Sequence, residues 1–298
     1  MRSHPEKLPV VVGVDEDPES VVALRWAAEE AAATSKELVV VHAFEWLTAV
    51  ARLGRDDHDF PLYGEHADPS ARTQYVRHAE GLLETAAGIV AETGTGVGVS
   101  TKNIEGRPFE VLSDEARDAS LLVLGSHGRG LLGRMLLGSV SNAIASDPPC
   151  PVAVIRPHTR AVPVEVTDMP VVVGFDATAA SHAALAYAAE HAALRGATLV
   201  VVHAFQPVGQ RAAGSVAGQT ARRAELLRDH VAPFVKDHPA LKVTCIVTEK
   251  RAAQSLVEWS TAARLVVVGT SGRRSHTGSV SQAVLHHSWS PVAVVPEP

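Results

Sequence analysis

Glycines and a serine gather in the stretch "GSHGRGLLGRMLLGSV" at residues 125–140, directly after the apolar run "SLLVL". Glycine weakens the interior of a helix or strand, so this density predicts a loop whose backbone must approach something closely. A Gly-rich turn that leads into a helix presents free N–H groups and the positive end of the helix dipole, which suit phosphate oxygens. Ser139 adds a hydroxyl donor. We therefore expect a phosphate-binding loop.

Two common nucleotide motifs fit this loop poorly. A P-loop requires G-x-x-x-x-G-K-[ST], and the chain contains no copy of it. The segment "GRGLLG" at 128–133 matches the dinucleotide fingerprint G-x-G-x-x-G. That fingerprint belongs after the first strand of its domain, whereas here it follows the fourth predicted strand. The remaining possibility is a nucleotide held by a loop of another kind.

The chain contains two copies of one pattern. "PVVVGVD" at 9–15 returns as "PVVVGFD" at 170–176, and "VVVHAF" at 39–44 returns 161 residues later. A period of this length implies duplicated domains, because solenoid repeats recur every 20–50 residues. We predict domains at residues 1–157 and 170–298, joined by a linker at 158–169.

Each copy alternates apolar runs with helical periodicity. "PVVVGVD" is typical of a short strand buried on both faces. The helix that follows places Leu24 and Ala28 on one stripe, with Ser20 as its expected N-cap, and a long helix is expected at 70–93. Five strands separated by helices predict, in each copy, a doubly wound parallel α/β sheet with helices on both faces.

Several polar residues follow the predicted strands. Ligands of such sheets bind outside the carboxyl ends of the strands, so Asp15, Val41 and the loop from Gly125 are expected to converge on one crevice. Asp15 and its counterpart Asp176 also permit a simpler interpretation, in which each caps the turn or helix that follows. The histidines in the apolar strands, His42 and His203, are predicted to be satisfied core residues rather than ligands.

Composition excludes several classes of protein. A net charge of −6 disfavours nucleic acid as a partner, and no run of 18 apolar residues is present to span a membrane. The N-terminal sequence lacks a signal-peptide layout, and Cys150 and Cys245 are too few for a disulfide framework. We expect both cysteines in the core, no metal site, because H-E-x-x-H and C-x-x-C are absent, and a cytoplasmic location.

The sequence resembles a tandem-domain universal stress protein of the actinobacterial type over nearly its whole length. The ATP-binding branch of that family carries G-x2-G-x9-G-[ST], and Gly125, Gly128, Gly138 and Ser139 fit it without a gap. The segment "NIEGRPFEVL" also resembles the family. The resemblance implies the adenine nucleotide alpha hydrolase-like fold, two domains related by a pseudo-twofold axis, and a homodimer.

The resemblance also implies roles for matched positions. Asp15 would meet the ribose and adenine, and Val41 would contact adenine through its backbone, while the glycine loop would hold the ribose and phosphates. The candidate ATP-binding residues of copy one are Gly13, Asp15, Val41, Gly125, Ser126, His127, Gly128, Arg129, Gly130, Gly138, Ser139 and Val140. Those of copy two are Gly174, Asp176, Val202, Gly269, Gly272, Arg273, Gly278, Ser279 and Val280.

Copy two departs from the family pattern in its loop. Only "RRSHT" separates Gly272 from Gly278, four residues fewer than in copy one, which removes about one helical turn of reach. Either this loop cannot wrap a triphosphate, or Arg273 and Arg274 compensate with charge. We expect the first site to bind ATP, with or without Mg²⁺, and the second to bind it weakly or not at all.

The resulting interpretation is a nucleotide-dependent regulator, which the family implies acts in stress, hypoxia or dormancy. A hydrolase needs a base or a water-positioning group near the γ-phosphate, and the loop supplies none. No G-x-S-x-G elbow is present, so we predict no catalytic residue and at most slow hydrolysis. The alternatives are a slow ATPase or nucleotidyl-transfer enzyme of related fold, and a nucleotide-free structural stress protein. No residue pattern names a protein partner.

Overall fold

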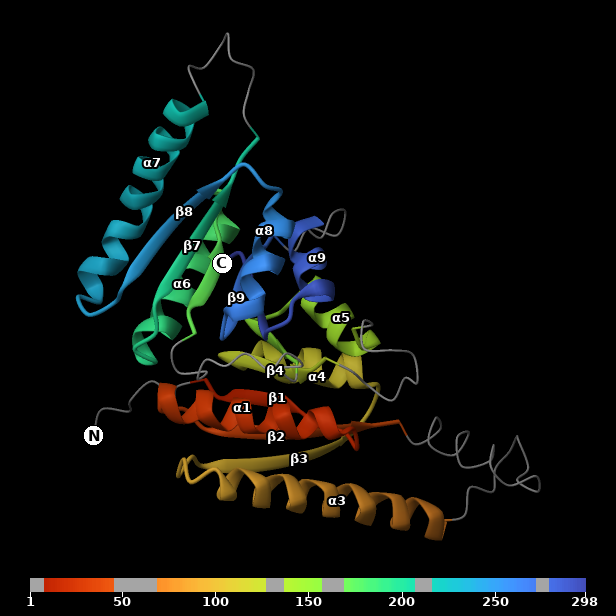
Figure 1. Ribbon diagram of the computed structural model, residues 1–298. Coiled ribbons are helices and arrows are strands. Elements are labelled where there is room, and N and C mark those ends of the chain that lie inside the picture. Colours follow the sequence, from red (N-terminus) through yellow and green to blue (C-terminus); the bar gives the residue numbers. More distant parts are fainter. Residues whose placement is uncertain (1–7, 46–68, 127–136, 157–168, 207–215, 272–278) are drawn as a thin grey trace. The chain divides into compact units, whose positions relative to one another are not determined.

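The structure is a computed structural model that describes residues 8–45, 69–126, 137–156, 169–206, 216–271 and 279–298. These residues form two compact units (Figure 1). Among these residues, the first unit comprises those up to Ser126 together with Gly138–Val140, and the second comprises Leu137 and those from Ser141 onward.

The first unit is a parallel sheet with helices between its strands. Its elements are β1 (Val10–Gly13), α1 (Pro18–Thr34), β2 (Leu38–Phe44), α3 (Pro69–Glu92), β3 (Val99–Glu105), α4 (Pro108–Arg117) and β4 (Leu121–Gly125). The strand order is β3-β2-β1-β4, with every pair parallel. This order places β1 and β4 side by side, and their carboxyl ends therefore meet at one edge of the sheet.

Helices cover both faces of this sheet. α1 and α3 pack against each other and between them against β1 to β4, whereas α4 packs against β1 and β2. The strands are almost wholly apolar, and Val12, Val40 and Val123 have no exposed surface. Strands buried on both faces cannot alternate apolar with polar residues, which explains the continuous valine runs of the sequence.

The start of α1 differs from the predicted one. Asp17 is the N-cap, and its side chain accepts a hydrogen bond from the N–H of Glu19, while Pro18 occupies the first helical position. The expectation that Ser20 is the N-cap is therefore wrong. Proline needs no hydrogen-bond acceptor for a backbone N–H and has a helix-compatible φ, so the helix begins earlier than the apolar stripe indicates.

The second unit repeats the pattern and adds one strand from the first copy. α5 (Ser139–Ser146) leads into it, and its further elements are β5 (Val152–Ile155), β6 (Val171–Gly174), α6 (Ala179–Leu194), β7 (Leu199–Ala204), α7 (Val216–Asp237), β8 (Val243–Thr248), α8 (Ala252–Trp259), β9 (Leu265–Thr270), α9 (Ser279–His287) and β10 (Val292–Pro296). The strand order is β5-β10-β9-β6-β7-β8.

All neighbours in this second sheet are parallel except β5 and β10, which pair antiparallel. The last strand of copy one thus pairs with the last strand of copy two, within the second unit. The prediction of a duplicated, doubly wound parallel fold with five strands per copy is confirmed.

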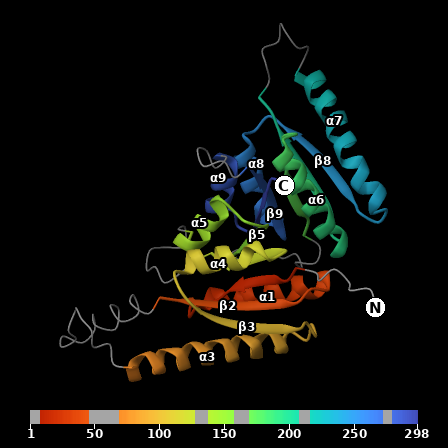
Figure 2. The same cartoon turned by 180° about the vertical axis from the view of Figure 1, so that it is seen from behind.

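The helices of the second unit also divide between two faces. α6 packs on β6, β9 and β10, and α8 packs on β6 and β7 (Figure 2). A Cβ on Gly269 would lie 2.3 Å from the carbonyl oxygen of Ala180, so only glycine lets α6 approach β9 this closely. Close packing also explains the glycine at position 174, because a Cβ there would lie 2.9 Å from the Leu256 side chain of α8.

Candidate functional site

The first candidate residue, Asp15, lies in the turn between β1 and α1. Its Oδ1 accepts hydrogen bonds from the N–H of Asp17, at 3.1 Å, and from the hydroxyl of Ser20. The Ser20 oxygen in turn accepts a bond from the N–H of Asp15, at 3.2 Å. Asp15 therefore organises the turn, as the simpler interpretation predicts. Both bonds use Oδ1, and the side chain is held in a fixed direction at the carboxyl end of β1.

The two ends of the glycine loop are joined by a hydrogen bond. The N–H of Gly138 donates to the carbonyl of Ser126, at 2.7 Å. Ser126 has no exposed surface, and its hydroxyl donates to Oε2 of Glu19 in the first turn of α1, also at 2.7 Å. The chain thus leaves and rejoins the sheet at one point. The predicted loop residues His127, Gly128, Arg129 and Gly130 lie outside the described residues.

The end of this loop starts a helix, as expected. Ser139 is exposed and is the first residue of α5, and Val140 follows it half-buried. The first N–H groups of a helix have no partner within it and carry the positive end of its dipole. Because the Gly138 N–H is already bonded to Ser126, the donors left for an anion at this point come from Ser139 and the residues after it.

The register of β2 decides which of its residues can meet a base. The N–H of Val10 donates to the carbonyl of Glu37 and that of Val14 to Val41, each at 2.9 Å, so odd-numbered residues of β2 turn their backbone groups toward β1. Val41 is fully buried and its carbonyl is used. The next odd residue is Ala43, which lies past the last β1–β2 pair, Gly13 with Val41.

In both strand histidines, a ring nitrogen lies within hydrogen-bond distance of a backbone carbonyl oxygen. Nδ1 of His42 lies 3.0 Å from the carbonyl oxygen of Val14, and Nδ1 of His203 lies 2.9 Å from that of Phe175. His42 is buried, which confirms its prediction as a core histidine. His203 is half-buried. Gly13 likewise has a packing role, because a Cβ there would lie 3.0–3.1 Å from the side chains of Leu112 and Leu124.

Asp176 occupies the matching turn of copy two and has other partners. Its Oδ1 accepts bonds from both the N–H and the hydroxyl of Thr178, at 3.1 and 2.6 Å. Burial raises the pKa of Asp176, but the hydrogen bonds from Thr178 and Ser181 outweigh it and hold the pKa below the ordinary value. Thr178 is also the N-cap of α6, where its side chain accepts from the Ser181 N–H.

The rest of the second candidate site is only partly described. The carbonyl of Val202 accepts from the Phe175 N–H at 2.9 Å, as Val41 does in copy one. At the end of β9, the Thr270 carbonyl accepts from the N–H of Glu297, also at 2.9 Å. Ser279 is the first residue of α9, and Val280 follows half-buried. Gly272, Arg273 and Gly278 lie outside the described residues.

Neither a metal cluster nor a membrane span is found in the described ranges. No group of three or more His, Cys, Asp and Glu residues there is placed to hold a metal ion. None of the helices described is long and apolar enough to cross a bilayer. Cys150 is buried as predicted, whereas Cys245 is only half-buried because it lies on β8, at the end of the strand order. Its assignment to the core is therefore wrong.

Three features of these sites were not predicted from the sequence. A serine follows the aspartate by five residues in both copies, and Ser20 and Ser181 each accept a bond from that aspartate's N–H. This recurrence could have identified them. The contact between Glu19 and Ser126 joins residues 107 positions apart, and no local pattern signals it. The position of Ala43 follows only from the strand register.

Two units built on mostly parallel strands, with helices on both faces, define a doubly wound α/β protein. The sequence profile of the universal stress protein family matches residues 8–156 and 169–296. The chain therefore belongs to the universal stress protein family, as a tandem member.

Similar proteins of known sequence are also tandem members from mycobacteria. Universal stress protein Rv2005c of Mycobacterium tuberculosis is 35% identical over 292 residues, covering 96% of both chains. Universal stress protein Rv2623 of the same species is 31% identical over 311 residues, covering 100% of this chain and 99% of its own. A solved universal stress protein structure from Archaeoglobus fulgidus matches with a TM-score of 0.72 at 17% identity, over 98% of this chain and 100% of its own.

Proposed function

We propose that the chain is an adenine-nucleotide-binding regulator, with ATP bound at the carboxyl edge of the first sheet. The proposal rests on the positions of Asp15 and Ala43, which both follow the last β1–β2 pair at that edge. Hydrogen bonds within the turn use Oδ1 of Asp15, so Oδ2 can accept hydrogen bonds from ribose hydroxyls. The N–H and C=O of Ala43 lie where β1 has ended, and such a donor–acceptor pair matches the edge of an adenine ring.

This assignment changes one expected role. A base contact from the Val41 backbone would have to compete with the β1–β2 ladder, because its carbonyl accepts from Val14. Ala43, two residues later, presents its backbone N–H and C=O without competing with the hydrogen bonds between β1 and β2. The phosphates would extend toward the start of α5, where Ser139 and the helix dipole supply donors and positive potential. Mg²⁺ bound to the nucleotide would neutralise part of the phosphate charge.

The described residues favour regulation over catalysis. A catalytic base for hydrolysis has to reach the attacking water near the γ-phosphate. Glu19, the carboxylate at the loop base, accepts a hydrogen bond from buried Ser126, and Asp15 is assigned to the ribose rather than to the γ-phosphate. We therefore expect turnover to be slow, with the occupied and empty states differing in the partners they bind.

The test is to denature freshly purified protein and to identify and count the released nucleotide. About one adenine nucleotide per chain is expected, lost in Asp15→Ala and retained in the matched variant Asp176→Ala. Ala43→Pro removes one donor and should weaken ATP binding at least tenfold, with the melting temperature of each variant recorded as a control for folding. Two nucleotides per chain would refute the asymmetry between copies. None, with no thermal shift in millimolar ATP, would refute nucleotide binding.

A further inference from the structure

The strand order ends at β3 in the first unit and at β8 in the second, and these two edge strands differ in character. Each of β3 and β8 pairs with one neighbour in the described parts of the chain, β2 and β7 respectively. β3 carries Lys102 and Glu105, which form ion pairs with Glu115 and Arg72. Charged side chains are a common means by which proteins protect an edge strand from pairing with another chain. The sequence of β8, "VTCIVT", contains no charged residue.

The difference is sharpest at one matched position. Lys102 pairs with Val41 of β2, and Ile246 pairs with Val202 of β7, so the two residues occupy the same place in each copy. Lys102 reaches Glu115 of α4, with 2.7 Å between Nζ and Oε2. The offset of 144 residues that aligns these segments puts Trp259 of α8 opposite Glu115. Copy two has replaced an ion pair with isoleucine and tryptophan, both half-buried.

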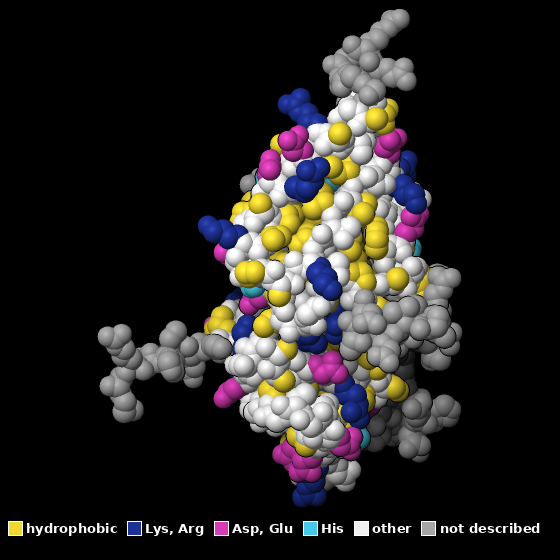
Figure 3. All heavy atoms as spheres, turned by 60° about the vertical axis from the view of Figure 1, so that its left-hand side comes forward, with side chains coloured by type: hydrophobic (Ala, Val, Ile, Leu, Met, Phe, Trp, Pro, Cys, Tyr) yellow, Lys and Arg dark blue, Asp and Glu magenta, His cyan; other side chains and the backbone are white. Residues whose placement is uncertain are grey.

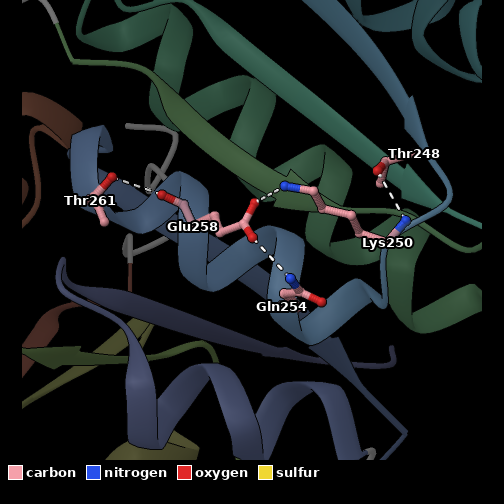
Figure 4. Close-up of polar contacts among 5 residues, drawn as sticks. All are labelled: Thr248, Lys250, Gln254, Glu258 and Thr261. Carbon is pink, nitrogen blue, oxygen red and sulfur yellow. Dashed lines mark hydrogen bonds and ion pairs between the residues drawn. The ribbon is translucent and has the colours of Figure 1, made fainter.

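Charges beside this apolar surface neutralise each other. Nζ of Lys250, just after β8, donates to Glu258 of α8, and the Gln254 side chain donates to the other carboxylate oxygen at 3.1 Å (Figure 4). On the side of the second unit where α7 and β8 lie, hydrophobic side chains gather in a patch with charged side chains around it (Figure 3). Contiguous apolar surface of this kind marks interaction sites on soluble proteins.

The backbone of β8 is oriented to accept another strand. The N–H of Leu199 donates to the carbonyl of Lys242 and that of Phe205 to Thr248, at 2.8 and 2.9 Å, so even-numbered residues face β7. The N–H and C=O groups of Val243, Cys245 and Val247 therefore point away from the sheet. They form a row of three donors and three acceptors at the regular spacing of a strand.

α7 decides what kind of partner fits. It packs on β8, its residues Leu227 and Val231 are buried, and it lies beside β8 in both views of the ribbon (Figures 1 and 2). Paired strands lie about 4.8 Å apart, whereas packed helices need 8–10 Å between their axes. A second copy pairing through its own β8 would bring its α7 into the same space. A single extended segment brings no such helix.

We propose that β8, with the apolar surface of Ile246 and Trp259, binds an extended segment of a partner protein, which adds a strand to the sheet. Its residues facing Ile246 and Trp259 would be apolar. Its opposite face would carry an acidic residue near the middle, because Arg228 of α7 is exposed and lies close enough to Cys245 to act on its thiol electrostatically. Main-chain bonds would supply affinity and these side chains specificity.

The test uses the full chain and a phage-displayed library of random 12-residue peptides. Peptides that alternate apolar residues and contain Asp or Glu are expected to be enriched. The corresponding synthetic peptide should slow amide hydrogen exchange at Val243, Cys245 and Val247. Cys245→Pro removes an outward N–H without touching the β7 ladder and should weaken binding at least tenfold.

Two further variants distinguish a loss of the binding surface from a loss of folding. Ile246→Lys restores the first copy's residue and should also abolish binding, while Thr101→Pro, at an outward position of β3, should leave it unchanged. Melting temperatures identify any variant that fails to fold. The proposal is overturned if selected peptides bind equally to all variants, if no peptide class is enriched, or if the chain sediments as a dimer that Cys245→Pro dissociates, which would assign the edge to a second copy.

Discussion

The turn after the first strand of each copy starts from the same aspartate and holds it differently. In copy one, Asp15 is bonded to Asp17 and Ser20, and Asp17 is the helix cap. In copy two, Thr178 supplies both donors to Asp176 and is itself the cap. In copy two, Thr178 both bonds the aspartate and caps the helix. In copy one, Asp17 and Ser20 share these two roles. Duplicated strands have kept their structure while the site above them has diverged.

The base of the glycine loop shows the same divergence. Copy one places the carboxylate of Glu19 against Ser126, whereas copy two has Ala180 at the matching position, with its backbone directly over Gly269. Close helix–sheet packing in copy two thus stands where copy one has a side-chain hydrogen bond. We therefore expect packing at Gly269 to contribute more to stability than the Glu19–Ser126 hydrogen bond.

The largest effect is expected for Gly269→Ala. The new methyl group would lie 2.3 Å from a backbone oxygen, so α6 must shift, and we expect the free energy of unfolding to fall by about 3 kcal/mol. Gly13→Ala meets only leucine side chains at 3.0–3.1 Å and should cost about 1 kcal/mol. Urea unfolding measures both. Equal losses would remove the contrast in packing, and Gly88→Ala, with no atom within 4 Å, is the control.

Next is Ser126→Ala. It removes the hydrogen bond to Glu19 and should cost roughly 1.5–2 kcal/mol, because bonds to charged groups are worth more than neutral ones. A double-mutant cycle with Glu19→Gln should give a coupling energy of about 1 kcal/mol. Additive losses in the two single variants would show that the contact contributes nothing to stability. ATP affinity measured on the same variants reports whether the loop base positions the nucleotide.

Thr178→Ala should cost about 1 kcal/mol at pH 7 as a lost N-cap. It should also raise the pKa of Asp176 toward the ordinary value of 3.8, because hydroxyl donation is lost. A carboxyl whose pKa is lowered by folding adds stability above its unfolded pKa, and this is lost as the pH falls through the folded pKa. The fall in unfolding free energy between pH 7 and pH 2 should therefore be smaller in the variant. An unchanged Asp176 titration by NMR would contradict the assignment.

The smallest effect is expected for Ala177→Gly. Ala177 adopts a φ of 65°, in the left-handed region that costs a non-glycine residue about 1 kcal/mol. Glycine removes this strain, but it also raises the conformational entropy of the unfolded chain, which offsets part of the gain. We therefore expect a stabilisation of about 0.5 kcal/mol. Glu16→Gly at the matching position of copy one, where φ is not positive, should destabilise by a similar amount, beyond the loss of its contact with His78. Thermal unfolding compares the two variants, with Glu16→Ala as the control for that contact.

Much of the fold could be predicted because its signals are local. The recurrence of "PVVVG" and "VVVHAF" identified the duplication, and uniform valine runs identified buried parallel strands. The long helix expected at 70–93 spans Pro69–Glu92. The helix start at Pro18 was not predicted because Asp17, Glu19 and Ser20 lie within four residues of one another and can each bond a backbone N–H group, and only geometry selects one.

The sequence by itself determined the two copies, their parallel α/β character, the family and the aspartate that ends each first strand. Tertiary structure alone decided that Ala43 rather than Val41 has backbone groups beyond β1, that Glu19 meets Ser126, and that β5 pairs with β10. Side-chain periodicity is a property of neighbouring residues and can be read along the chain. The direction of a strand's backbone groups depends on which strand it pairs with and in what register, and pairing is settled only when distant segments pack.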